Sequence, residues 1–381
     1  MLCAVSKKIL LTATELHLSQ FWVPHIENFI NHGFSVDIIC SNVSNKVDLL
    51  KHMLGDLPVR VDVVDLARSP FKLSNINGYK QMKKILADRK YDIIMTNEPV
   101  MGVVTRLAAK KYRKAGTKVL YTAHGFHFYK GAPKLNWLIF YPIEKWLSKY
   151  TDALVTINTE DFDRAKRKFK AKNTYYLPGI GIDISKFSKN AETRKQKRAE
   201  LGLKDNEIML FSVAELTKRK NLAVAIKAMS RIIGSNIKYF VRGEGELKEY
   251  LLGLIKQYNL GDKVFLLGYG KDIPQMCNAA DIFIFPTLQE GLPVALMEAM
   301  ANGLPVLCSN VRGNVDLIED GKGGFTYDKY DFEGFAKGID LLAKNAELRK
   351  TMAEYNIKKL EKFKLSNIQN KYVKIIYELF K

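Results

Sequence analysis

The sequence has few cysteines and no long apolar run. None of its four cysteines (Cys3, Cys40, Cys277 and Cys308) is part of a C-x-x-C pair, and no two are close in sequence. This spacing indicates neither a disulfide framework nor a zinc site, and it favours a reducing, cytoplasmic location. No apolar run approaches the roughly 20 residues of a membrane-spanning helix, so we expect none. The amino-terminal stretch also lacks the cleavage site of a secretory signal.

Acidic residues are too few to balance the basic ones. The 60 Lys and Arg against 40 Asp and Glu give a formal net charge of +20. Such an excess can attract nucleic acid, acidic lipid headgroups or phosphorylated substrates. Basic clusters at residues 110–114 and 164–170 lie on helix-like stretches. No nucleic-acid-binding signature accompanies them, so we expect no nucleic-acid partner. Two interpretations stay open, a solvated helix face and contact with an anionic membrane surface.

The order of apolar and amphipathic segments predicts an α/β fold. The 381 residues suffice for about two domains. Short apolar runs alternate with longer helix-period stretches, which is the pattern of parallel sheets covered by helices. Predicted strands lie at residues 8–13, 35–40, 59–65, 93–96, 118–122, 153–157, 208–214, 238–242, 264–267, 282–286 and 306–309. We therefore expect two doubly wound domains of similar size that face each other across a cleft.

The strand pattern pauses once, near the middle of the chain. Residues 175–183 carry Pro178 and two glycines, and a charged stretch follows before the next strand. The sequence thus predicts an N-terminal domain over residues 1–180 and a C-terminal domain over residues 181–365. Residues 366–381 read as an amphipathic helix that packs back on the N-terminal domain.

The strongest motif is FPTLQEGLPVALMEAM, which begins at Phe285. A strand ends there, a loop with Gly291 follows, and a helix begins. Ligands of open α/β sheets bind beyond the carboxyl ends of strands, where loop amides and a helix N-terminus attract anions. Glu290 in the loop is suited to accept hydrogen bonds from sugar hydroxyls, and Glu298 in the helix can accept from a ribose diol. Either glutamate alone could be an ordinary helix-terminal charge, but together they indicate a sugar-nucleotide site.

Further residues of the second half fit the same ligand. Lys220 follows a strand and precedes a helix, which suits a phosphate ligand. Arg219 could add charge there or be a solvated loop residue. Gly243 and Gly245 lack the third glycine of a dinucleotide fingerprint, so a dehydrogenase is excluded.

These motifs resemble glycosyltransferase family 4, a GT-B family of retaining enzymes. The resemblance rests on the Glu-x7-Glu spacing within EGLPVALMEAMANGLPV and on SVAELTKRKNLAVAIKAM, and it spans nearly the whole chain. It implies two Rossmann-like domains and a nucleoside-diphosphate sugar donor, for which we expect UDP. It also implies a role in bacterial capsule or exopolysaccharide synthesis, with a saccharide acceptor. We expect this acceptor to be carried on a lipid at the cytoplasmic face of the membrane, because the first half is basic and its aromatic residues near positions 126–137 should be exposed. The chain has Glu215 where the family usually has an arginine, which leaves the diphosphate site one cation short.

The resemblance also assigns roles to single residues. A histidine at the position of His124 contacts the donor sugar in the family, although a lone histidine here could be a structural hydrogen-bonding group. The loop after the first strand reads TATELHLSQF, where the family often has glycines. The implied catalytic residues are Glu290, His124 and Lys220. The implied donor-binding residues are Glu298, Lys220, Arg219, Gly291, Leu292, Gly243, Gly245 and Tyr269. The expected acceptor-side residues are Thr14, Glu15 and His17, which follow the first strand, and Asn97, which follows another.

The pair Asp161 and Asp163 has the Asp-x-Asp pattern that holds a metal in GT-A transferases. It falls in NTEDFDRAKRKF, at a predicted helix start, where aspartate is favoured by capping and by the helix dipole. We therefore expect no metal and no cofactor besides the sugar-nucleotide co-substrate. A GT-B epimerase or phosphorylase, and a noncatalytic sugar-nucleotide-binding partner of another transferase, remain as alternatives.

Overall fold

The fold consists of two α/β units. The computed structural model describes residues 7–381 except 15, 44, 188 and 235, and for residues 16–20 it describes only the backbone. Unit 1 comprises Met1–Gly181 and Leu365–Lys381, and unit 2 comprises Ile182–Lys364. The contacts thus divide the chain one residue after the predicted boundary at 180 and one residue before the predicted boundary at 365.

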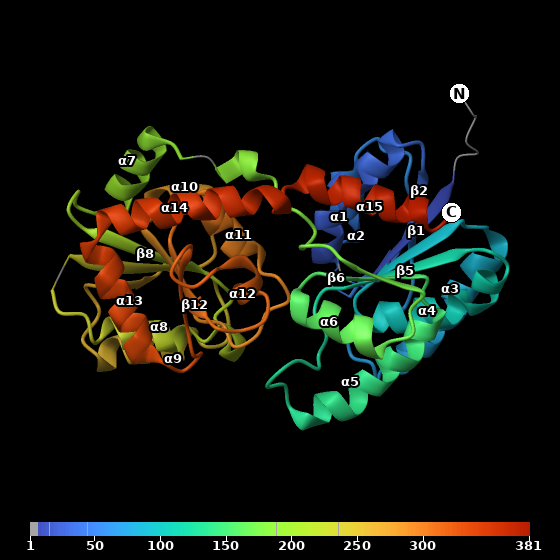
Figure 1. The fold of residues 1–381 in the computed structure, drawn as a ribbon, viewed down its shortest axis with the longest axis horizontal. Coiled ribbons are helices and arrows are strands. Elements are labelled where there is room, and N and C mark those ends of the chain that lie inside the picture. Colours follow the sequence, from blue (N-terminus) through green and yellow to red (C-terminus); the bar gives the residue numbers. More distant parts are fainter. Residues whose placement is uncertain (1–6, 15, 44, 188, 235) are drawn as a thin grey trace. The chain divides into compact units, whose positions relative to one another are not determined.

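Unit 1 contains a parallel seven-stranded sheet in the order β3-β2-β1-β4-β5-β6-β7 (Figure 1). Its strands are β1 (Lys8–Ala13), β2 (Ser35–Cys40), β3 (Arg60–Val63), β4 (Ile93–Asn97), β5 (Lys118–Ala123), β6 (Ala153–Thr156) and β7 (Asn173–Tyr176). Its helices are α1 (Leu16–Asn31), α2 (Val47–Leu54), α3 (Ser74–Asp88), α4 (Pro99–Lys114), α5 (Lys134–Leu147), η1 (Ser148–Tyr150), α6 (Thr159–Lys168) and α15 (Leu365–Glu378).

Successive side chains of the unit 1 strands point to opposite faces of the sheet. In β1, Ile9 and Leu11 join the core under α1, α2 and α15, whereas Leu10 joins the core under α3 and α4. Because both faces are covered by helices, nearly every residue of β1, β2, β4 and β5 is buried. This double burial produced the continuous apolar runs by which these strands were predicted.

Unit 2 contains a parallel six-stranded sheet in the order β10-β9-β8-β11-β12-β13. Its strands are β8 (Ile208–Val213), β9 (Ile237–Arg242), β10 (Val264–Leu266), β11 (Ile282–Phe285), β12 (Val306–Ser309) and β13 (Gly324–Tyr327). Its helices are η2 (Ile184–Phe187), α7 (Ala191–Glu200), η3 (Lys218–Lys220), α8 (Leu222–Met229), α9 (Lys248–Gln257), α10 (Ile273–Ala279), α11 (Val294–Ala301), α12 (Asn314–Leu317), α13 (Phe332–Lys344), α14 (Ala346–Leu360) and η4 (Glu361–Phe363). The predicted class of two parallel-sheet α/β domains is confirmed.

Two short strands escaped the sequence prediction. β7 and β13 each form one edge of a sheet, and most of their residues are only partly buried. An edge strand that is half covered needs no continuous apolar run. β7 overlaps the segment that leads into the predicted domain boundary. β13 begins with a glycine, a residue typical of loops, so its sequence did not indicate a strand.

The order of strands reverses once in each sheet. In unit 1 the chain winds from β1 to β3 on one side and from β4 to β7 on the other. In unit 2 it winds from β8 to β10 on one side and from β11 to β13 on the other. Loops that leave the carboxyl ends of two such neighbouring strands run apart and leave a crevice for ligands. The candidate sites are therefore the loops after β1 and β4, and those after β8 and β11.

One prediction about the surface is wrong. Phe126 and Phe128, which the membrane hypothesis took as exposed aromatics, are buried and stack on each other at 4.8 Å between ring centroids. They pack against α5 and α6 instead of reaching solvent.

None of the helices that the structure describes is long and apolar enough to cross a membrane. Cys40, Cys277 and Cys308 are buried free thiols, whereas Cys3 lies outside the described residues.

The last helix, α15, closes the core of unit 1. The Tyr372 ring contacts Trp22 edge-on at 5.2 Å, and its hydroxyl lies 3.3 Å from that of Thr122 in β5. Gln369 donates from Nε2 to the carbonyl of Pro24 in α1 at 2.7 Å. A segment at the end of the chain therefore covers strands formed near its beginning (Figure 1).

We predict that Ile376→Ala destabilises unit 1 by about 2–5 kcal/mol, because it leaves a cavity where a fully buried side chain packs. Lys374→Ala, an exposed position of the same helix, should change the free energy of unfolding by less than about 0.5 kcal/mol. Urea unfolding followed by circular dichroism measures both. Equal stability of the two variants would contradict the packing described for α15.

Candidate functional site

An ion pair joins the loops that follow β8 and β11. Lys220 Nζ lies 2.7 Å from Glu290 Oε1, and both side chains are largely buried, with exposed fractions of 13% and 10%. The Lys220 ammonium also lies 4.9 Å from the ring centroid of Phe285, the last residue of β11. The predicted residues Lys220 and Glu290, which are 70 positions apart, thus meet at the point where the strand order of unit 2 reverses.

One oxygen of Glu290 receives several hydrogen bonds. Besides Lys220, Oε1 accepts from Arg219 at 3.0 Å and from the hydroxyl of Thr287 at 2.9 Å. The other oxygen, Oε2, has no hydrogen-bond partner among the described residues. The backbone carbonyl of Glu290 accepts from Arg312 Nε at 3.1 Å. The carboxylate is therefore held through Oε1 while Oε2 keeps its capacity to accept hydrogen bonds from a ligand.

Backbone contacts hold the two loops together. Asn221, at the start of α8, has a φ of +54°, a left-handed conformation that asparagine tolerates better than most residues. Its Nδ2 donates to the carbonyls of Pro286 and Lys329 at 2.9 and 2.7 Å. The amide of Leu288 donates to the carbonyl of Arg219 at 2.8 Å. Glu290 and Lys220 thus sit on backbones that are fixed to each other.

The two predicted glycines permit a close approach of neighbouring loops. A Cβ on Gly243 would lie 1.9 Å from the carbonyl oxygen of Ala214, and one on Gly245 would lie 2.6 Å from that of Leu216. Gly243 also has a φ of +147°. Only glycine therefore lets the loop after β9 pack against the loop that leads to Lys220. Tyr269, in the loop after β10, is 70% exposed.

Glu298 lies on α11 and is largely, but not fully, removed from solvent. Burial raises the pKa of its carboxyl group from 4.5 to about 7. Burial and the nearby Glu298 also raise the pKa of the Cys277 thiol on α10. Leu292 is buried, and Gly291 is closely packed, since a Cβ on Gly313 would lie 2.5 Å from its carbonyl oxygen. No hydrogen bond joins Glu298 to Glu290 among the described residues, so the two glutamates have separate surroundings.

In unit 1, predicted residues meet at the corresponding reversal of strand order. The amide of Thr14, after β1, donates to Glu98 Oε2 at 2.8 Å. Asn97, at the end of β4, donates to the carbonyl of Thr12 at 3.4 Å, and its Oδ1 lies 3.2 Å from His124 Nε2. Glu98 adopts a φ of +67°, which turns the chain into α4. Thr14, Asn97 and His124 are therefore neighbours at the carboxyl edge of this sheet.

Burial keeps His124 uncharged near neutral pH, because it lowers the pKa of the imidazole to about 4. A neutral imidazole has one donor and one acceptor nitrogen, so Nε2 can donate to Asn97 Oδ1, but the ring is not a cation at pH 7. Two other predicted acceptor-side residues are not seen: Glu15 lies outside the described residues, and the side chain of His17 is not described.

The Asp-x-Asp pair has the structural position that the helix start predicts. Asp161 is fully buried and accepts from the amide of Phe126 at 2.9 Å and from Asn158 Nδ2 at 3.0 Å. Asp163 is exposed. The described part of the chain contains no group of three or more His, Cys, Asp or Glu side chains placed to hold a metal ion.

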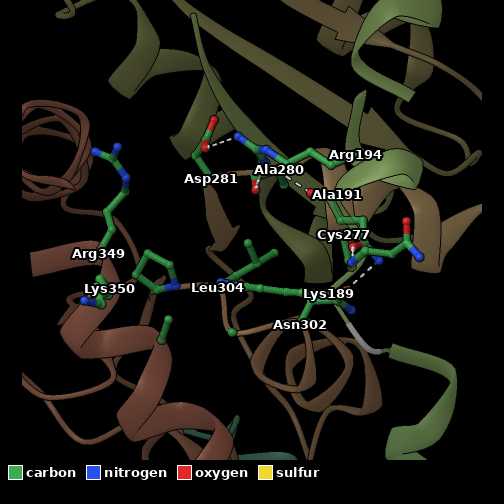
Figure 2. A pocket seen from close by; sticks show the side chains of 15 residues that line it. Lys189, Ala191, Arg194, Cys277, Ala280, Asp281, Asn302, Leu304, Arg349 and Lys350 are labelled. Carbon is green, nitrogen blue, oxygen red and sulfur yellow. Dashed lines mark hydrogen bonds and ion pairs between the residues drawn. The ribbon is translucent and has the colours of Figure 1, made fainter. Parts of the chain in front are cut away.

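A cavity of about 550 Å³ lies at the other end of the unit 2 sheet, near the residues that precede β11 and β12 (Figure 2). Arg194 crosses its wall, donating to the carbonyls of Asn278, Ala279 and Ala280 and forming an ion pair with Asp281 at 2.7 Å. These contacts join α7 to the end of α10. We therefore assign the ion pair in this cavity to the packing of helices.

Sequence reasoning missed two residues that contact Glu290. Thr287 is fully buried and lies two positions after β11, within the motif itself. Arg312 is 7% exposed and lies in the loop between β12 and α12, outside the motifs described above. The contact between Arg312 and Glu290 could not be predicted from the sequence, because Arg312 donates to a backbone carbonyl, a group that every residue has.

The pKa of Glu298 predicts a pH dependence of stability. Because the folded state binds this proton more tightly than the unfolded chain, its contribution is full below about pH 4.5 and is lost as the pH rises through about 7. Relative to Glu298→Gln, the wild type should lose up to about 3 kcal/mol over this range. Urea unfolding between pH 4.5 and 8.5 measures the difference, with the exposed Glu249→Gln as control. Parallel profiles of wild type and Glu298→Gln would refute the shift.

Comparisons with known proteins identify the family of the chain. Residues 8–158 match the family model described as Glycosyl transferase 4-like, and residues 193–359 match Glycosyl transferases group 1. EpsD of Bacillus subtilis (strain 168) is 35% identical over 92% of this chain and 91% of its own length. The UDP-Gal:alpha-D-GlcNAc-diphosphoundecaprenol alpha-1,3-galactosyltransferase of Escherichia coli is 30% identical over 88% of this chain and 89% of its own. Anabaena HepE, solved with UDP, has the same fold, with a TM-score of 0.82 at 17% identity over 98% of this chain and 100% of HepE. The chain therefore belongs to the family 4-like GT-B glycosyltransferases and is itself a glycosyltransferase.

Proposed function

We propose that the protein transfers a sugar from a UDP-sugar to a saccharide acceptor carried on a lipid, with retention of the anomeric configuration. The observation that carries this proposal is the Glu290 cluster of unit 2. Two cations hold one oxygen of a largely buried carboxylate, and the other oxygen has no hydrogen-bond partner among the residues that the structure describes. A sugar and a diphosphate are the ligand groups that match an accepting oxygen next to cations.

UDP is the proposed nucleotide. The Escherichia coli relative is named for UDP-Gal, and HepE was crystallised with UDP. In this chain, Lys220 and Arg219 would stabilise the charge that develops on the departing diphosphate. Their ion pairs with Glu290 orient both side chains at the crevice before any ligand is present. Gly243, Gly245 and Tyr269 would line the nucleotide at the neighbouring loops.

The two glutamates would have different tasks. Glu290 would hold the hydroxyls of the donor sugar through Oε2 and stabilise the oxocarbenium-like transition state. Glu298 would accept hydrogen bonds from the ribose hydroxyls, which requires the carboxylate form. Because burial raises its pKa to about 7, donor binding should strengthen as the pH rises through neutrality. We assign His124 to the donor sugar from the family resemblance, as an uncharged hydrogen-bonding group.

Retention would proceed by substitution on one face of the sugar. The bond between the anomeric carbon and the diphosphate oxygen breaks, the bond to the acceptor oxygen forms on the same face, and the acceptor proton moves to the departing diphosphate. No enzyme nucleophile is required by this route. We propose that the reaction also needs no metal ion, because Lys220, Arg219 and the loop amides supply the positive charge.

The proposed acceptor is a diphosphate-linked polyprenyl saccharide at the cytoplasmic face of the membrane, as in the synthesis of bacterial surface polysaccharides. The name of the Escherichia coli relative, in which the acceptor is alpha-D-GlcNAc-diphosphoundecaprenol, supports this class. The net charge of +20 suits an acceptor that carries a diphosphate and is presented in an anionic bilayer.

We predict that Glu290→Ala and Lys220→Ala each lower turnover at least ~100-fold, the scale of losing one transition-state contact. Glu347→Ala and Lys256→Ala, which remove exposed charges of the same unit, should retain wild-type turnover. Product formation from a UDP-sugar, with the new linkage read by NMR and with EDTA present, measures rate, retention and metal independence together. Wild-type turnover in Glu290→Ala would overturn the assignment.

A thermal-shift screen of UDP-, GDP-, ADP- and TDP-sugars tests the donor class. A ligand at 100 times its Kd stabilises the native state by about 2.7 kcal/mol, so the cognate donor should raise Tm by several degrees. We expect UDP-sugars to give the largest shift and Lys220→Ala to reduce it. A larger shift with another nucleotide would replace UDP in the proposal.

A further inference from the structure

Helix α5 in unit 1 exposes an apolar face. Leu135, Leu138 and Trp146 have exposed fractions of 62%, 75% and 46%. Their positions, together with the exposed Pro142, follow the spacing i, i+3, i+7, i+11, which places them along one stripe of the helix. The opposite side of α5 is buried against the Phe128 cluster. An apolar stripe of this size on the surface of a folded unit indicates a contact with an apolar phase or partner.

The exposed charges of the segment that carries this stripe are of one sign. Residues 130–150 carry four lysines, all exposed, and a single carboxylate. That carboxylate, Glu144, is buried and forms an ion pair at 2.9 Å with Arg106, which is 1% exposed. The net exposed charge of the segment is therefore wholly positive. The four lysines are Lys130, Lys134, Lys145 and Lys149.

Aromatic rings and lysines are interleaved at the end of the stripe. Trp146 and Tyr150 meet edge-on at 5.5 Å between ring centroids. Lys149 Nζ lies 5.0 Å from each of these rings. Lys110 of α4, part of the first basic cluster of the sequence, lies 5.1 Å from Tyr150. The basic cluster on α4 is thus continuous with the apolar stripe on α5.

The apolar stripe and the lysines beside it distinguish between two possible partners of the α5 face, a second copy of the chain and an anionic lipid bilayer. A second copy of the chain packed on the same face would bring lysines of equal charge together, which is unfavourable. An anionic bilayer offers negative headgroups to the lysines and an apolar interior to the leucines, while Trp146 suits the boundary between them. Charge complementarity therefore favours the bilayer.

We propose that the α5 face, defined by Leu135, Leu138, Trp146, Lys145 and Lys149, docks on the surface of an anionic lipid bilayer. The helix would lie in the interface with its leucines below the headgroups. The inference deepens the proposed function, and it rests on that function only for its purpose, since a lipid-linked acceptor is presented at such a surface. Docking itself requires neither donor nor acceptor.

Vesicle flotation of the full chain tests the proposal. With vesicles of phosphatidylcholine in which about one third of the lipid is phosphatidylglycerol, we expect binding that weakens in high salt. Pure phosphatidylcholine vesicles should bind far less. The double variant L135S/L138S should bind ~10-fold more weakly. The double variant K145Q/K149Q should lose about fivefold per lysine on anionic vesicles only.

Matched controls come from unit 2. Ile233→Ser removes an apolar side chain that is 97% exposed, and K256Q/K337Q removes two exposed lysines; both should bind vesicles like the wild type. Circular dichroism melting checks that every variant is folded. If L135S/L138S binds as tightly as the wild type, or if it converts a dimer to a monomer in sedimentation without affecting vesicle binding, the proposal is wrong.

Turnover with a water-soluble acceptor analogue separates this inference from the proposed function. L135S/L138S should keep that turnover, because these leucines lie outside the catalytic machinery. Intact turnover without vesicle binding in the wild type would reject docking and leave the function standing. Vesicle binding without any sugar transfer by the wild type would reject the function and leave docking standing.

Discussion

The ion pair between Lys220 and Glu290 sits where the winding of the unit 2 sheet reverses, and the proposed chemistry depends on it. Charged groups that are largely removed from water are stable only when they are paired and hydrogen-bonded. Lys220, Arg219 and Thr287 all donate to one oxygen of Glu290, so the carboxylate is held in a fixed orientation. That same arrangement leaves the second oxygen able to accept from a ligand.

The contrast between Glu290 and Glu298 shows how neighbours set the behaviour of two similar residues. Both glutamates belong to one motif, eight positions apart. Glu290 is surrounded by donors, whereas burial on α11 raises the pKa of Glu298 to about 7. A proton on Glu298 near neutrality would be displaced by ribose hydroxyls that donate to the carboxylate. The same residue would thus link donor binding to pH.

Unit 1 also brings polar residues together where its strand order reverses, but fewer of them are charged. Its reversal of strand order brings Thr14, Asn97 and His124 together through neutral hydrogen bonds and one carboxylate, Glu98. Exposed lysines of α4 and of the α5 segment lie elsewhere on this unit, beside an apolar stripe. The separation suits a unit that would bind an uncharged saccharide at one edge and a charged bilayer on another face.

The sequence by itself determined the two doubly wound units, most strands and the motif residues Glu290, Glu298 and Lys220. Buried parallel strands and strand-to-helix turns leave local patterns, which explains why the fold class could be predicted and the motif located. Only the tertiary structure decided which residues meet across 70 positions, that Thr287 and Arg312 support Glu290, and that Phe126 is core. Edge strands such as β7, and contacts to backbone carbonyls, depend on packing between distant segments, and a local pattern does not record that packing.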